Sequence, residues 1–155
     1  MKKLKNILVT QKLNSDTLNE IARFIWKLRN EESARLVSRN ASIISLEDHL
    51  IWFNKKINDA ASYLYVFQLG NNMVSMVRLD LIKEKRVYEI SVIVKSDFRG
   101  KGISSKSINN VLTMHSELPI HAEIKKNNSV SQHLFENLGF IKVGQKDEFL
   151  EYKLK

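Results

Sequence analysis

A cationic, glycine-bearing loop, DFRGKGISS, lies near the middle of this 155-residue chain, which has only five glycines in all. Gly100 and Gly102 alternate with Arg99 and Lys101 in this loop. Glycines allow consecutive backbone N–H groups to turn toward one point and form a nest that binds anions. An apolar run, EISVIV, precedes the loop and a helical pattern, SKSINNVL, follows it, so a helix dipole is directed at the same point. The loop predicts a phosphate site between a strand and a helix, although glycines also form ordinary tight turns.

The composition excludes several kinds of chemistry. The chain has no cysteine, which rules out a disulfide framework, a thiol nucleophile and a thiolate metal site. His115, His121 and His133 share no metal-ligand spacing, so we expect no metal and interpret all three as structural or exposed. The formal net charge of +8 favours an anionic partner such as a phosphorylated cofactor or a nucleotide, or else reflects a lysine-rich solvated surface.

The hydrophobic pattern predicts one α+β domain over residues 1–155, with a single mixed, mostly antiparallel sheet and about four helices. Aromatic and β-branched runs predict strands over 6–13, 62–69, 73–82, 87–94, 118–124, 141–145 and 148–154. Helical spacing predicts helices over 15–30 and 45–57, from the glycine loop to about 114, and over 127–139. Ser15 and Ser45 are the expected N-caps of the first two helices, and residues 31–44 form a polar, partly helical connection.

Several features bear on the compartment of the protein. No segment is long and apolar enough for a membrane span. The apolar run at residues 7–9 is too short for a secretion signal, and the lack of cysteine fits a reducing compartment. We therefore expect a cytoplasmic protein with no membrane partner.

Two segments resemble motifs of one enzyme superfamily. RGKGIS resembles the acetyl-CoA pyrophosphate loop, R/Q-x-x-G-x-G/A, of the GNAT N-acetyltransferases, with Arg99 and Gly102 at the first two motif positions. Ser104 stands at the last position, where it replaces the Gly or Ala of the motif by another small residue. NSVSQHLFENLGF, residues 128–140, is similar to the N-x-x-S/A…L-Y-E-K-L-G-F segment of that superfamily. The expected order of elements matches as well. The resemblance implies the GNAT fold, with a splayed central strand, and acyl transfer from acetyl-CoA to an amine.

The same resemblance implies how acetyl-CoA is held. A bulge is expected to splay the strand before the loop, so that backbone N–H groups of this strand face the thioester. The implied cofactor contacts are Val92, Val94, Arg99, Gly100, Lys101, Gly102, Ile103, Ser104, Asn128, Ser131 and Phe135. Asn128 can at the same time be a helix N-cap. Phe135 stands where the superfamily often has a tyrosine that protonates the leaving thiolate, so either another group donates that proton or the thiolate leaves unassisted.

Two residues are candidates for the base that takes the proton of the amine. Glu89 lies ten residues before Arg99, a placement that resembles the catalytic glutamate of several GNAT enzymes. The alternative for Glu89 is a solvated or cross-strand-paired side chain. His49 is the second candidate, because an ordinary imidazole titrates near neutral pH, and its alternative is a packed or surface residue beside Trp52.

The N-terminal half resembles a narrower group of enzymes. Residues 28–57 are similar to acetyltransferases acting on UDP-linked 4-amino-4,6-dideoxy sugars in pseudaminic acid biosynthesis, which share R-N and H-x-x-W/F patterns. This implies a nucleotide-linked amino sugar as the small-molecule amine substrate, bound by Arg29, Asn30 and Trp52. Ribosomal-protein acetyltransferases carry loosely similar helices, so acetylation of a protein N-terminus or of another small amine is the alternative.

A third interpretation is a GNAT domain that binds CoA or nucleic acid without catalysis. Phe135 and the net charge of +8 favour it slightly, whereas the intact loop around Arg99 and Gly102 argues against it. We therefore expect an enzyme and no nucleic-acid partner. The sequence leaves open the sugar isomer and the choice between monomer and dimer.

Overall fold

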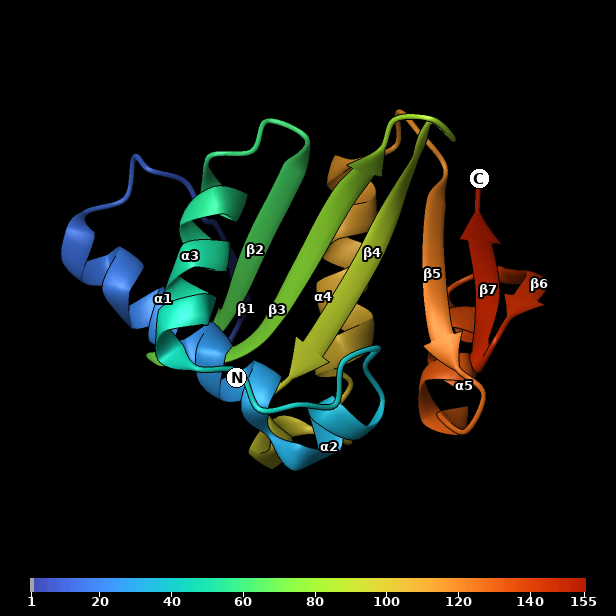
Figure 1. Cartoon of the computed structure of the whole chain (residues 1–155), viewed down its shortest axis with the longest axis horizontal. Helices are drawn as coiled ribbons and strands as arrows, with labels where there is room; N and C mark the ends of the chain where they lie inside the picture. Colours follow the sequence, from blue (N-terminus) through green and yellow to red (C-terminus); the bar gives the residue numbers. More distant parts are fainter. Residues whose placement is uncertain (1) are drawn as a thin grey trace.

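A seven-stranded sheet with the order β1-β2-β3-β4-β5-β7-β6 organises the chain, and the computed structural model describes residues 2–155 (Figure 1). The strands are β1 Leu4–Leu8, β2 Ser62–Leu69, β3 Asn72–Ile82, β4 Val87–Val94, β5 Ile120–Lys125, β6 Ile141–Lys146 and β7 Phe149–Leu154. All neighbours pair antiparallel except β4 and β5, which pair parallel. The predicted mixed, mostly antiparallel sheet is confirmed. The first strand lies earlier in the chain than predicted.

Five α-helices and one 3₁₀ turn complete the described chain. They are α1 Ser15–Asn30, α2 Glu32–Leu36, α3 Leu46–Ile57, η1 Ser96–Phe98, α4 Ile103–Met114 and α5 Ser129–Asn137. The additional helix, α2, is one short turn within the connection predicted as partly helical. Ser45 caps α3 as predicted, but Asn14 rather than Ser15 caps α1, because its side chain accepts the Thr17 N–H at 2.8 Å. Within residues 2–155, no helix is both long and apolar enough to cross a bilayer.

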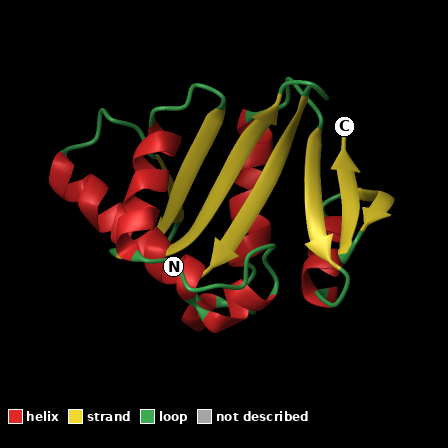
Figure 2. Ribbon diagram, viewed as in Figure 1, coloured by secondary structure: helices red, strands yellow, loops and turns green. Residues whose placement is uncertain are grey.

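The helices cover both faces of the sheet (Figure 2). The alternation of side chains along the strands gives each face its own apolar core. On one face, α1 and α3 pack on the sheet around Ile25, Leu28, Phe53, Val66 and Met76. On the other face, α4 and α5 pack around Phe67, Leu79, Ile108, Val111 and Phe135. Two cores on opposite faces hold the sheet as a rigid frame for the loops at its ends.

The strands β4 and β5 pair only at one end. Their register consists of Tyr88 opposite Ile120 and Glu89 opposite His121, and beyond this point the two strands diverge (Figure 1). The predicted splay is confirmed. The bulge expected in β4 is wrong, because its register with β3 runs without a shift from Val87 to Val94. The splay arises instead because β5 leaves β4 and pairs along its whole length with β7.

A buried pair of hydroxyls fixes α4 on the sheet. The Ser75 Oγ of β3 and the Ser107 Oγ of α4 lie 2.8 Å apart, and both residues are fully buried. Ile108 and Val111, on the same helix, are also fully buried. The position of α4, and therefore of the glycine loop before it, is set by apolar packing together with this buried polar contact.

We expect Ser107→Ala to lower the free energy of unfolding by about 1–3 kcal/mol, because the Ser75 hydroxyl is left buried without a partner. The double variant Ser75→Ala/Ser107→Ala removes both hydroxyls and is expected to be more stable than the single variant. Urea unfolding followed by circular dichroism measures both. A double variant that loses the sum of the two single losses would contradict the role given to this contact.

Candidate active site

The glycine loop has the backbone that an anion nest needs. Gly100 and Gly102 have φ values of +74° and +76°, in the left-handed region that favours glycine. A Cβ at either position would meet no heavy atom of residues 2–155 within 4 Å, so both glycines face open space. Gly102 precedes α4, whose first turn has no acidic residue and, in the described chain, no side-chain cap. The first N–H groups of α4 are therefore available to a diphosphate, and the loop fits the pyrophosphate of acetyl-CoA.

The guanidinium group of Arg99 is exposed, but its nitrogens are already bound to neighbours in the same chain. Its Nε donates to the Val94 carbonyl at 3.1 Å, and its Nη1 donates to the Ser33 hydroxyl. Its Nη2 forms an ion pair with the Glu31 carboxylate at 3.2 Å. Glu31 and Ser33 belong to the junction of α1 and α2. A diphosphate that binds Arg99 must therefore compete with a carboxylate of the same chain. Lys101, the second cation of the loop, lies near the Phe98 ring.

Where β4 and β5 diverge, the edge of β4 that faces β5 carries backbone N–H groups without a strand partner. The Tyr88 N–H donates to the Pro119 carbonyl on the β5 side, at 2.9 Å, whereas the Lys95 N–H donates to the Val74 carbonyl on the β3 side. Peptide groups alternate in direction along a strand, so the N–H groups of Val92 and Val94 point to the same side as that of Tyr88. These two N–H groups are suited to a carbonyl oxygen. Since the Val94 and Ile103 side chains are buried, only the backbone of those residues can contact a ligand.

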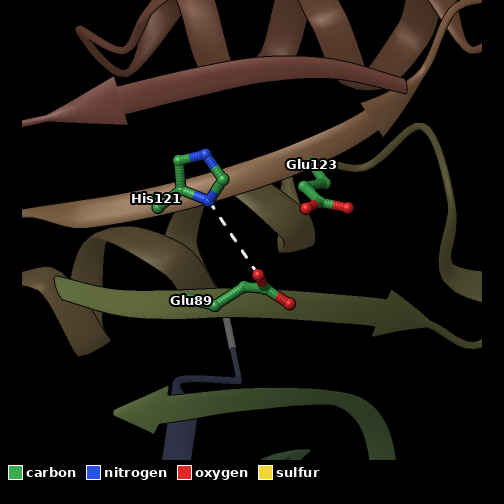
Figure 3. Close-up of side chains that lie close together, drawn as sticks. All are labelled: Glu89, His121 and Glu123. Carbon is green, nitrogen blue, oxygen red and sulfur yellow. Dashed lines mark ion pairs between the residues drawn. The ribbon is translucent and has the colours of Figure 1, made fainter. Parts of the chain in front are cut away.

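Glu89 lies with two other polar side chains where β4 and β5 begin to diverge (Figure 3). The closest atoms of Glu89, His121 and Glu123 all lie within 4.8 Å of one another, and the Glu89 Oε2 is 3.9 Å from the His121 Nδ1. The Glu89 side chain is 35% exposed, so it can reach a ligand. The Arg39 guanidinium already pairs with the Glu123 carboxylate.

His121 and Glu123 were not among the site residues predicted from the sequence. In β5, IHAEIK, the apolar residues face the α4 core and the polar residues face the opposite side. That alternation was visible in the sequence. The pairing of His121 with Glu89 was not, because it depends on a parallel register between strands that are distant in the chain.

His49 does not fit the role of base that its sequence context suggested. It is fully buried, its Nε2–H donates to the Ala22 carbonyl at 2.7 Å, and its Nδ1 accepts from the Arg29 Nη1 at 3.0 Å. Burial, helped by the Arg29 charge and opposed by the bond to Ala22, lowers the pKa of His49 to about 4. A neutral imidazole with both nitrogens occupied cannot take a proton from a substrate. We propose instead that it holds Arg29 in place.

The other residues predicted to bind substrate differ in how free their side chains are to contact a ligand. Asn30 donates to the Ile44 carbonyl and accepts the Ile44 N–H, at 2.9 and 2.7 Å, so its amide closes the connection before α3. The Arg29 guanidinium lies over the Trp52 ring, 4.2 Å from its centroid. One face of Trp52 is therefore covered by a cation. Phe53, its neighbour, is buried in the core.

The segment expected to contact the cofactor from α5 is largely structural. Asn128 caps α5, because its side chain accepts the Ser131 N–H at 3.2 Å. Phe135 is only 3% exposed, and its ring meets the Phe140 ring edge-on at 4.9 Å. The Phe135 ring is thus part of the core. Its predicted contact with the cofactor finds no support in this arrangement.

Comparisons with known proteins identify the family. The profile of the acetyltransferase (GNAT) family matches residues 19–140. The chain belongs to this family, and it is accordingly an N-acetyltransferase whose acyl donor is acetyl-CoA. The predicted superfamily, fold, class of enzyme and co-substrate are confirmed.

Solved structures agree on the fold. Spermidine N-acetyltransferase from Vibrio cholerae, in complex with CoA and spermine, is 22% identical, with a TM-score of 0.77 over 97% of this chain and 92% of that chain. The N-acetyltransferase PseH of Campylobacter jejuni is 19% identical, with a TM-score of 0.70 over 98% and 97%. An acetyltransferase from Thermus thermophilus is 16% identical, with a TM-score of 0.81 over 99% of both chains. No curated protein matches the chain in sequence.

We expect Glu31→Gln to tighten acetyl-CoA binding about two- to fivefold, because Arg99 is freed from a partly exposed ion pair worth up to about 1 kcal/mol. Titration calorimetry with acetyl-CoA measures the dissociation constant. Glu32→Gln, which removes the same charge from the exposed neighbouring position, is the control and is expected to bind like wild type. Equal affinities for wild type and Glu31→Gln would contradict the competition.

Proposed function

We propose that the amine acetylated by this enzyme belongs to a nucleotide-linked amino sugar of the UDP-4-amino-4,6-dideoxy type. The observation that carries the proposal is a pair of arginines at one tryptophan. The Arg29 guanidinium lies 4.2 Å, and the Arg78 guanidinium 5.4 Å, from the centroid of the Trp52 ring. Arg78 stands opposite Ser91 in β4, two residues beyond Glu89, and therefore shares a face of the sheet with Glu89.

The two cations favour an anionic ligand. Burial first, and the Arg78 charge second, lower the pKa of Arg29 to about 10, so the Arg29 guanidinium is still charged at neutral pH. Arg78 is paired with Asp80 at 2.7 Å, but the one hydrogen bond that the Arg29 side chain forms within residues 2–155 is to neutral His49. The charges of Arg29 and Arg78 repel each other, and a bound diphosphate would offset that repulsion. Guanidinium groups bind such phosphates in a bidentate manner.

The charge of the whole protein supports the same class of acceptor. A formal net charge of +8 attracts a nucleotide diphosphate and opposes a polycation such as spermidine. The likeness to spermidine acetyltransferases, at 22% identity or less, concerns the fold. Glu89 and Glu123 do offer two carboxylates to an ammonium group, so polyamine acetylation is the specific alternative.

The residues of the site then have separate tasks. The neutral amine attacks the thioester of acetyl-CoA and takes its acetyl group, and the CoA thiolate leaves. Glu89 accepts a proton from the incoming ammonium group, directly or through a water molecule. The N–H of Val92 donates to the carbonyl oxygen as negative charge develops there. Phe135 is buried and has no proton to donate, so the CoA thiolate takes its proton from solvent.

A panel of amines tests the substrate class. Thiol release from acetyl-CoA is measured with a UDP-4-amino-4,6-dideoxy sugar, a free amino sugar, spermidine and a peptide with a free N-terminus. We expect the highest kcat/KM with the nucleotide sugar. Arg29→Gln is expected to raise its KM about tenfold or more, since a charge-assisted hydrogen bond is worth about 1.5–3 kcal/mol. Arg23→Gln, on the exposed side of the same helix, is the control.

A higher kcat/KM with spermidine or with the peptide would show that the acceptor belongs to that class of amine and is not a nucleotide sugar. If acetyl-CoA binds but no amine on the panel is acetylated, the proposed acceptor is wrong.

For the base, we expect Glu89→Gln to lower kcat/KM about 100-fold at pH 7, because the isosteric amide cannot accept a proton. The deficit should shrink as the pH rises, because more of the amine is then already neutral. Steady-state kinetics between pH 6 and 9 measure this, with Glu84→Gln in the exposed β3–β4 turn as the control. A Glu89→Gln enzyme with unchanged kcat/KM would show that Glu89 is not the base.

A further inference from the structure

We infer that His121 is the proton-relay partner of Glu89: the proton that Glu89 takes from the amine passes to the imidazole of His121 and from there to solvent. The inference rests on the proposed acetylation of an amine, but not on the choice of amine. Sequence reasoning treated His121 as structural or exposed, and no comparison assigns it a role.

The backbone holds the two side chains together. Glu89 and His121 are the last pair of residues in register before β4 and β5 diverge, and both side chains lie on the face opposite to α4 (Figure 3). The Glu89 Oε2 and the His121 Nδ1 are 3.9 Å apart. That distance is too long for a direct hydrogen bond, and one bridging water or a small rotation of the Glu89 side chain completes the contact.

The other histidines are placed for other tasks. His49 has both ring nitrogens occupied by Ala22 and Arg29. His115 is buried on the α4 side, where its Nε2 meets the Tyr65 hydroxyl at 2.7 Å. His133 is exposed on α5. Of the four histidines, His121 is the one that faces the proposed base, and its side chain is 15% exposed.

Charged groups from β4, β5, β7 and the α2–α3 connection lie around His121. On β4 it faces the Glu89 carboxylate, and on its own strand Glu123 lies two residues further along. On β7 it is opposite Lys153, while Glu151 is opposite Glu123. Arg39, from the connection between α2 and α3, pairs with Glu123 and offsets that carboxylate. Glu89 is left as the nearest unpaired anion to the imidazole, balanced in part by Lys153.

The chemistry of the reaction needs such an exit. The ammonium group of the substrate loses two protons to solvent, and the CoA thiolate takes one proton from solvent, so one proton is released in the net reaction. The C–N bond forms as the C–S bond breaks, and no oxidant or reductant takes part. An ordinary carboxylic acid titrates near 4.3 and an ordinary imidazole near 6.5, so an imidazole retains a proton at neutral pH far better than a carboxylate does. A relay from Glu89 to His121 therefore keeps the carboxylate free for the next proton.

The experiment uses His121→Gln and His121→Ala in the full-length enzyme, with whichever amine the wild type acetylates. We expect kcat/KM to fall about 10- to 100-fold at pH 7, with unchanged acetyl-CoA affinity by calorimetry. The acid limb that an imidazole gives to the pH profile should disappear in His121→Gln. Added imidazole should restore part of the activity of His121→Ala. His133→Gln is the matched control and is expected to behave like wild type.

The double variant Glu89→Gln/His121→Gln separates a shared pathway from two independent effects. Residues that act in one relay are not additive, so the double variant should be no slower than Glu89→Gln alone. An additive loss, a wild-type pH profile in His121→Gln, or no rescue by imidazole would overturn the relay. Since the wild type is measured first with every amine of the panel, a wrong substrate class shows itself separately and leaves this test intact.

Discussion

The loss of pairing between β4 and β5 is the constraint on which the site depends. A parallel pair that ends after Glu89 and His121 leaves the peptide groups of Val92 and Val94 at a free edge inside the molecule. Unpaired backbone groups of this kind are costly unless a ligand or water satisfies them. Two features offset that cost and hold β4 in place. They are the apolar cores on both faces of the sheet and the continuous pairing of β4 with β3.

The segment that follows α1 joins the two diverging arms of the sheet. On the β4 side, Glu31 holds Arg99, and on the β5 side, Lys125 donates to the Leu36 carbonyl at 3.0 Å while Arg39 pairs with Glu123. This short, mostly exposed segment therefore contacts both Arg99, at the proposed cofactor site, and Glu123, at the proposed acceptor site. Such contacts exchange partners at low cost, in contrast to the buried cores on which the frame depends.

Cations and carboxylates lie together on the face of the sheet that carries Glu89. His49 is neutral because it is buried, and in that form it accepts a hydrogen bond from Arg29 and holds it over Trp52. The carboxylates lie further along the same face, beside the divergence. Cations for an anionic group and carboxylates for an ammonium group thus share one face of the sheet, which suits an acceptor that carries both.

The sequence by itself determined what depends on neighbouring residues in the chain. The left-handed glycines of the loop, the cap at Ser45, the strand and helix patterns and the family motif are local features, because backbone preference and side-chain periodicity act over a few residues. Only the tertiary structure decided which distant residues meet. It buried His49 and Phe135, brought His121 to Glu89, and replaced the expected bulge by a change of strand partner. These outcomes depend on strand register and core packing, which arise from contacts between segments far apart in the sequence.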